Sequence, residues 1–96
     1  MPTYETTARF TSDLDRLTPE QRRRFRRSVE AFVDGLRTGS FRPSLRVKGV
    51  RRAPGVYELT WAGNGRATWM YGVEVRRGEH HIIWQRIGTH DILAGP

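Results

Sequence analysis

Two residues in the second half of the chain have the type and the setting that proton transfer and phosphate recognition require. Arg66 follows a Gly-Asn-Gly turn at residues 63–65 and leads into a run of strand formers that contains Trp69 and Tyr71. An arginine at the start of a strand is held more firmly than one in a loop, so it can offer a fixed pair of donors to a phosphate. His90 follows Ile87-Gly88-Thr89 at the end of the last expected strand. A histidine can act as general acid and general base near neutral pH, although a solvent-exposed tail histidine is the alternative interpretation.

The other two histidines do not indicate a metal site. His80 and His81 are adjacent, so in a strand their side chains lie on opposite faces, and one is expected to face solvent while the other packs. The chain contains no cysteine, and no third ligand is clustered with the two histidines. The sequence therefore predicts no metal site, and the lack of cysteine also excludes disulfides and thiolate chemistry.

The charge of the chain indicates a negatively charged partner. Its 96 residues include 17 lysines and arginines, all arginine except Lys48, and 10 aspartates and glutamates, which gives a formal net charge of +7. A GC-rich genome would account for the preference for arginine over lysine, but it does not account for the net charge. The excess favours a nucleic acid, or an acidic protein that masks the positive surface.

The basic residues form two groups along the chain. The first group is a helix face between residues 22 and 27 that includes Arg22, Arg23 and Arg26. Glu30 and Asp34 can neutralise part of this face, so a solvated surface is the alternative to electrostatic attraction of RNA. The second group lies in a connecting segment and the strands after it, where dense charge over a rigid sheet is frequent at binding sites. Its members are Arg46, Lys48, Arg51, Arg52 and Arg66.

The first half of the chain is expected to form one short strand and two helices. Residues 3–7 are strand formers, and a short helix follows whose apolar face consists of Phe10, Leu14 and Leu17. A longer helix begins at Thr18, where Gln21 is in place to complete a capping box, and it is expected to end at Gly39. Its apolar stripe is made of Phe25, Val29, Phe32, Val33 and Leu36.

The second half of the chain is expected to form a three-stranded meander after a basic connecting segment at 40–55, which holds a short extended piece at 45–48. The strands are predicted at 56–61, 67–76 and 80–87, and residues 88–96 form a short tail. The middle strand has one apolar face, made of Trp69, Tyr71, Val73 and Val75. Strands joined by such short turns run antiparallel. Because both helices precede the meander, the sequence predicts an α+β fold in which a short first strand and two N-terminal helices pack with an antiparallel sheet.

The length of the chain predicts one domain that covers residues 1–96. No apolar run is long enough to cross a membrane, and the first residues lack the basic and apolar stretches of a signal peptide. The expected location is therefore the cytoplasm.

Several segments, taken in order, resemble the RelE/ParE superfamily of toxins from bacterial type II toxin–antitoxin modules. They are the apolar positions of the opening helix, the passage from Val47-Lys48-Gly49 to Gly55-Val56-Tyr57-Glu58-Leu59, the strand Gly65-Arg66-Ala67-Thr68-Trp69-Met70-Tyr71, and the ending Ile87-Gly88-Thr89-His90-Asp91-Ile92-Leu93. None of these motifs is specific alone. The resemblance lies in their order and spacing over nearly the whole of a basic chain, and it implies a RelE-like fold.

The resemblance also implies a ribonuclease that acts in the ribosomal A site. Members similar to RelE, YoeB and HigB are mRNA interferases, in which a ribose 2′-hydroxyl attacks the adjacent phosphate without a metal or another cofactor. By position, Arg66 is similar to the strand arginine that stabilises the phosphate, and His90 lies where members carry a catalytic histidine or arginine. Glu58 lies near a variable active-site position and could act as base or orient Arg66. The residues expected to line the path of the RNA are Lys48, Arg51 and Arg52.

A partner and two departures from the family pattern follow from the same resemblance. The partner is a cognate acidic antitoxin that covers the basic surface. Glu58 and Thr60 stand where many members have lysines, and Ile92 and Leu93 stand where many have a catalytic aromatic residue. The sequence leaves three functions open: a ribosome-dependent endoribonuclease, a ParE-like toxin that inhibits DNA gyrase, and a non-catalytic basic module that binds RNA or protein.

Overall fold

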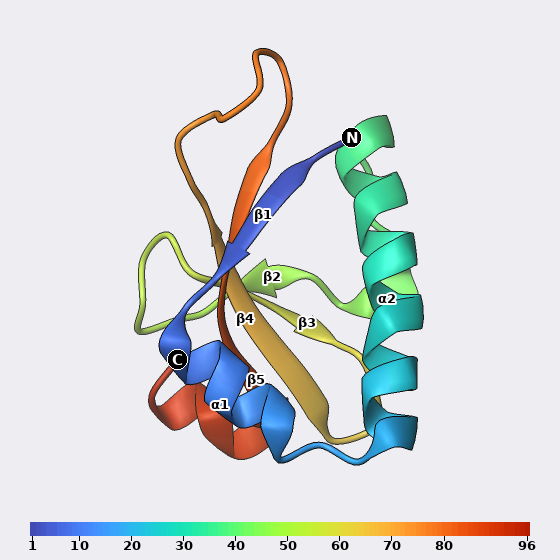
Figure 1. Ribbon diagram of the computed structural model, residues 1–96, viewed down its shortest axis with the longest axis vertical. Helices are drawn as coiled ribbons and strands as arrows, with labels where there is room; N and C mark the ends of the chain where they lie inside the picture. Colours follow the sequence, from blue (N-terminus) through green and yellow to red (C-terminus); the bar gives the residue numbers. More distant parts are fainter.

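A five-stranded sheet with one long helix along its side forms the body of the protein (Figure 1). The computed structural model describes residues 1–96. In chain order the elements are β1 (Thr3–Thr6), α1 (Ala8–Asp15), α2 (Pro19–Thr38), the 3-10 turn η1 (Pro43–Leu45), β2 (Lys48–Gly49), β3 (Tyr57–Thr60), β4 (Gly65–Tyr71), β5 (His81–Thr89) and the 3-10 turn η2 (His90–Ala94). In Figure 1, α2 lies to one side of the sheet, whereas η2 and the loop between β2 and β3 lie to the other.

The strand order is β1-β5-β4-β3-β2, and the sheet is mixed. The expected meander of β3, β4 and β5 is antiparallel, and β2 joins it antiparallel to β3. β1 instead pairs with β5 in parallel, with Thr3 beside His81 and Thr6 beside Trp84. Parallel neighbours need a long crossover, and here the crossover is most of the chain, because β1 and β5 are the first and last strands. The predicted α+β class with two N-terminal helices is confirmed, but the expectation of an all-antiparallel sheet is wrong for β1.

The ends of α2 follow the predicted signals. The Thr18 hydroxyl accepts a hydrogen bond from the Gln21 N–H, and the Thr18 N–H donates to the Gln21 side chain, so the capping box is complete. At the other end, Gly39 has a φ of 83°, the left-handed conformation that a glycine adopts without a steric penalty.

The core lies between α2 and one face of the sheet. Phe25, Phe32 and Leu36 of α2 are buried, whereas Val29 and Val33 are only half-buried. The ring centroids of Phe32 and Trp69 lie 4.8 Å apart in a T-shaped arrangement, which aromatic rings favour. On the sheet, the other buried side chains of this face are Leu59, Ala67, Ile82, Trp84 and Ile87.

β4 ends five residues earlier than the alternation of apolar residues predicts. Its last pair with β5 is Tyr71 with Ile82, and one further bond joins the Gly72 N–H to the His81 carbonyl. Beyond this point β4 has no partner, because the chain turns in a loop before β5 begins. Val73 and Val75 are therefore 88% and 67% exposed, and the prediction that they share the buried face of Trp69 is wrong.

β5 contains a bulge that decides which face each of its side chains takes. Thr68 pairs with Arg86, but the next residue of β4, Trp69, pairs with Trp84, so Gln85 is extra. A bulge of one residue reverses the alternation beyond it. Trp84 and Ile87 therefore both face the core, and Arg86 faces away from it. Without the bulge, Arg86 would share the face of Trp84.

The adjacent histidines behave as predicted. His80 is exposed, whereas His81 is buried. The His81 ring lies 2.7 Å from the Thr3 hydroxyl and 2.8 Å from the Glu5 carboxylate, so it ties β1 to β5.

Candidate functional site

The face of the sheet away from α2 carries the predicted site residues of the strands. Alternation in β4 puts Ala67 and Trp69 in the core, so Arg66 and Thr68 point to the opposite side. Pairing then aligns two rows across the sheet on that side. One row is Lys48, Glu58, Thr68 and Arg86, and the other is Thr60, Arg66 and Gly88. We call this side the polar face and define it by Lys48, Glu58, Thr60, Arg66, Thr68 and Arg86.

Arg86 is the residue of the polar face with the most defined surroundings. Its Nε donates to Asp13 Oδ2 at 2.7 Å and its Nη2 to Asp13 Oδ1 at 3.2 Å, so a carboxylate of α1 holds the guanidinium with both oxygens. Nη1 donates to the Gly95 carbonyl at 2.9 Å. The side chains of Arg86 and Asp13 are only 16% and 9% exposed. Arg86 is therefore a fixed cation at the edge of the polar face.

The ionisation of the pair follows from these contacts. Burial by itself raises the pKa of Asp13, but the hydrogen bonds from Arg86 and the Ile87 N–H, with the positive charges of Arg86 and Arg16, outweigh burial. The net effect is a pKa of Asp13 below its usual value. The hydrogen bond to Asp13 raises the pKa of Arg86. Both groups are thus charged at neutral pH.

Arg66 is held by its own hairpin. Its Nη1 lies 3.3 Å from the Gly63 carbonyl and 3.0 Å from the Gly65 carbonyl and donates to both. The Gly65 backbone passes close to Trp61, since a Cβ at Gly65 would lie 2.6 Å from the indole ring, and the Trp61 N–H donates to the Arg66 carbonyl at 3.0 Å. The hairpin is therefore tightly packed at the point where Arg66 leaves it.

His90 lies against the same hairpin. It is the first residue of η2, and its backbone N–H donates to the Asn64 carbonyl at 2.9 Å. Its side chain is exposed. η2 also packs on the sheet through Ile92, because a Cβ at Gly88 would lie 2.9 Å from Ile92 Cγ2. The structure therefore brings the backbone of His90 and the guanidinium of Arg66 to one turn, residues 63–65.

Glu58 lies in the centre of the polar face and is 7% exposed. Its neighbours in register are Lys48 on β2 and Thr68 on β4, and Arg66 lies diagonally across from it. The Thr68 hydroxyl is fully buried and has no hydrogen-bond partner. A buried polar atom of this kind is rare in proteins, and here it lies between Glu58 and Arg86.

The other predicted RNA-binding residues divide between two sides of the molecule. Arg51 and Arg52 are exposed in the β2–β3 loop, which projects away from α2 in Figure 1. Arg46, at the end of η1, is also exposed. The arginines of α2 lie on the other side of the sheet, where Arg23 and Arg26 are exposed and Arg22 donates to the Leu14 carbonyl at 3.5 Å. The structure does not bring Arg22, Arg23 and Arg26 to the polar face.

Arg86 and Asp13 are the residues that sequence reasoning missed. Simple alternation in β5 would assign Arg86 to the side of Ile82 and Trp84, where a charge has no obvious role. The one available signal was the charge itself, within a strand that is otherwise rich in apolar residues. Asp13 carried no signal, because nothing in the sequence links α1 to β5.

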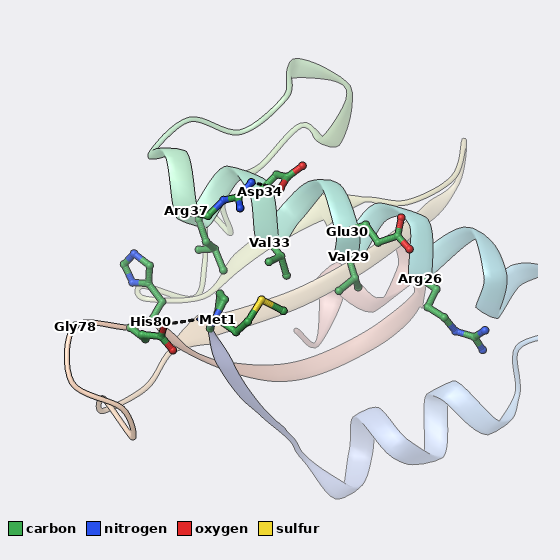
Figure 2. A pocket seen from close by; sticks show the side chains of 12 residues that line it. Met1, Arg26, Val29, Glu30, Val33, Asp34, Arg37, Gly78 and His80 are labelled. Carbon is green, nitrogen blue, oxygen red and sulfur yellow. Dashed lines mark hydrogen bonds and ion pairs between the residues drawn. The ribbon is translucent and has the colours of Figure 1, made fainter.

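A groove runs along α2 on the side away from the polar face. Its larger part is a cavity of about 1050 Å³, bounded by Val29, Val33 and Leu36 of α2, by Met1 and by the end of the β4–β5 loop (Figure 2). A second cavity of about 330 Å³ continues it toward α1 and is bounded by Tyr4, Thr6, Phe10, Leu14, Arg22, Phe25, Arg26, Val29 and Trp84. Arg26 and Val29 border both cavities. The two cavities therefore form one groove between β1 and α2, which we call the β1–α2 groove.

Two further structural features bear on function. No group of three or more histidine, aspartate or glutamate side chains is arranged to hold a metal ion. None of the helices combines the length and the apolar character that a membrane crossing requires.

Comparison with known proteins gives matches at the level of structure only. The sequence matches no protein-family model and no curated protein. A chain in the RelB–RelE antitoxin–toxin complex from Methanococcus jannaschii is 18% identical, with a TM-score of 0.60 and 93% of each chain covered. A chain in the Escherichia coli DinJ–YafQ complex is 12% identical, with a TM-score of 0.69 and coverage of 99% of this chain and 100% of that one. A metal-bound toxin from Helicobacter pylori is 16% identical, with a TM-score of 0.62 and coverage of 95% and 97%.

These identities are too low to transfer a function, but the agreement in structure extends over nearly the whole chain. The two helices and the mixed sheet thus belong to an architecture that other chains share. This chain has the RelE-like α+β fold that is seen in the RelE and YafQ toxin structures.

Proposed function

We propose that the protein is the toxin of a type II toxin–antitoxin system and that it cleaves mRNA on the ribosome as an endoribonuclease. The observation that carries the proposal is the polar face, which combines two arginines, a glutamate and a nearby histidine on one side of a RelE-like fold. Toxins with this fold include RelE and YafQ.

The proposed chemistry is attack of a ribose 2′-hydroxyl on the adjacent phosphate. This reaction needs a base for the hydroxyl proton, cations for the charge that develops on phosphorus, and an acid for the leaving 5′-oxygen. Arg66 and Arg86 supply the cations. His90 handles a proton at the reacting oxygens, and Glu58 acts as base or orients Arg66. Lys48, Arg51 and Arg52 lie at the same side of the sheet and bind flanking phosphates.

Expression of the protein in a bacterial host tests the proposal. Growth is expected to stop, and primer extension on cellular mRNA is expected to show new 5′ ends inside translated codons. Arg66→Ala and His90→Ala are expected to restore growth while the protein remains folded by circular dichroism.

Other outcomes identify the alternatives. Growth arrest with DNA-damage induction, trapped gyrase and intact mRNA would indicate a ParE-like toxin instead. Harmless expression of the wild-type protein would indicate a non-catalytic binding module. Toxicity that survives both substitutions would contradict the assignment of Arg66 and His90.

The partner in this proposal is an acidic antitoxin, and the β1–α2 groove is the surface we assign to it. Relatives with this fold have been crystallised in complexes named for an antitoxin and a toxin. β1 is an edge strand whose Tyr4 side chain is 71% exposed, so its outer backbone groups can pair with an added strand. The apolar floor suits alternate side chains of such a strand, and Arg22 and Arg26 suit its acidic residues. A second copy of this chain, also at +7, would be repelled.

Val33→Glu is expected to weaken binding of the cognate antitoxin at least tenfold, because it places a negative charge in the apolar floor opposite an acidic partner. Isothermal titration calorimetry measures the change. Ser12→Glu, which adds the same charge at an exposed position of α1 outside the groove, is the matched control. Equal affinities of the two variants would show that the antitoxin binds elsewhere.

A further inference from the structure

We propose that Asp13 is a positioning residue for the cleavage reaction, because it sets the orientation in which Arg86 meets the scissile phosphate. The inference rests on the proposed ribonuclease function and adds to it a residue from α1, an element with no other part in the site.

The Asp13 carboxylate is itself held in place by the backbone of β5, and it also binds the Arg86 side chain. Oδ2 accepts from the Ile87 backbone N–H at 3.2 Å and from Arg86 Nε at 2.7 Å, and Oδ1 accepts from Arg86 Nη2. The carboxylate is thus bound both to the backbone of β5 and to the side chain of the preceding residue on that strand. A guanidinium held in this way has one orientation relative to the sheet.

The fold explains why an aspartate in α1 is in reach of β5. β1 pairs with β5 only as far as Trp84. From there the chain continues along the same edge, since the Thr7 N–H donates to the Trp84 carbonyl and the Thr7 hydroxyl to the Gln85 carbonyl. α1 follows directly, and Asp13 takes the place of a strand partner for the Ile87 N–H. The bulge at Gln85 turns the side chain of the next residue, Arg86, to the polar face, so that Arg86 and the Ile87 N–H both lie within reach of Asp13.

Two N–H groups of Arg86 have no partner within the protein. A guanidinium carries five N–H groups, of which one on each nitrogen is used by Asp13 or Gly95. One N–H on Nη1 and one on Nη2 are left. An arginine free in solution samples many rotamers, and ordering it costs about 2 kcal/mol of conformational entropy. Asp13 orders Arg86 before RNA binds, which favours the transition state that Arg86 stabilises.

Asp13→Asn is the variant that tests this inference. The amide keeps the size of the carboxylate and one oxygen acceptor for the Ile87 N–H, but it cannot accept from both nitrogens of Arg86. With ribosomes programmed with a defined mRNA, we expect kcat to fall about tenfold and KM to change less than twofold. Asp15→Asn, an exposed aspartate of the same helix, is the matched control and is expected to cleave like the wild type.

A double-mutant cycle separates positioning from a purely structural role. If Asp13 acts through Arg86, then Asp13→Asn causes no further loss of kcat in an Arg86→Ala background. If Asp13→Asn lowers the melting temperature but leaves kcat unchanged at a temperature where the variant is folded, the inference is overturned. Should Asp13→Asn fail to fold, Asp13→Glu is the second variant, because it keeps the charge and shifts the carboxylate by one methylene. It is expected to lower kcat at least threefold. A wild-type kcat for Asp13→Glu would overturn the inference. A wild-type protein that cleaves no mRNA would overturn the proposed function itself. A wild-type protein that cleaves mRNA, together with an Asp13→Asn variant that cleaves equally well, would overturn only the inference about Asp13.

Discussion

Replacing His90 by alanine is expected to lower the rate of mRNA cleavage about 100-fold or more, the range that removal of a general acid or base produces. The His90 side chain is exposed at the start of η2, and its backbone is anchored to the hairpin that also holds Arg66. It is therefore accessible to RNA while its position is constrained. Single-turnover cleavage on programmed ribosomes measures the effect, because it separates the chemical step from product release.

His80→Ala provides the control for this prediction. His80 is also an exposed histidine, but it lies just before β5, whereas His90 lies just after it. The nine residues of β5 separate the two by about 30 Å. His80→Ala is expected to cleave at the wild-type rate. Equal rates for His90→Ala and the wild type would remove His90 from the mechanism and leave Glu58 as the remaining proton-handling residue.

Asp13→Ala is expected to lower the free energy of unfolding by about 3–5 kcal/mol, the usual cost of removing one partner of a buried ion pair. The substitution leaves Arg86, which is 16% exposed, without its counter-charge, and it leaves the Ile87 N–H without its acceptor. A loss of this size is a large part of the stability of a typical small domain. Urea unfolding at neutral pH measures it, and Asp15→Ala, at an exposed position of α1, should cost less than 1 kcal/mol.

The same pair makes stability depend on pH in a defined direction. The pKa of Asp13 is lower in the folded protein than its usual value, so folding favours the charged carboxylate. This contribution is fully present above the unfolded pKa of about 3.9 and is lost as the pH falls through the lower pKa of the folded state. Acid unfolding of Asp13→Asn, which has no proton to bind at this position, should therefore show a shallower loss of stability below about pH 4 than the wild type. Parallel curves would show that Asp13 titrates alike in both states.

Much of the secondary structure could be predicted because its signals are local. The start of α2 depends on Thr18 and Gln21 within one turn, and its end depends on Gly39 alone. That only one of the adjacent residues His80 and His81 is buried follows from the alternation of a strand. These features need only neighbours along the chain, so no knowledge of distant partners was required.

The extent of β4 and the direction of β1 could not be predicted in the same way. Val73 and Val75 have the alternation of a strand, but a strand needs a partner, and β5 begins only at His81. Likewise, the sequence of β1 is compatible with either direction of pairing. Its place beside β5 is a property of the whole chain.

The sequence by itself determined the α+β class, the two helices, the strong positive charge and the presence of Arg66 and His90 near the ends of strands. Only the tertiary structure decided that Arg86 belongs to the polar face and that Asp13 holds it. The physical reason is the bulge at Gln85: one extra residue exchanges the faces of every side chain that follows. Such a residue is visible only when β4 and β5 are paired, and the carboxylate that holds Arg86 comes from 73 positions away in the chain.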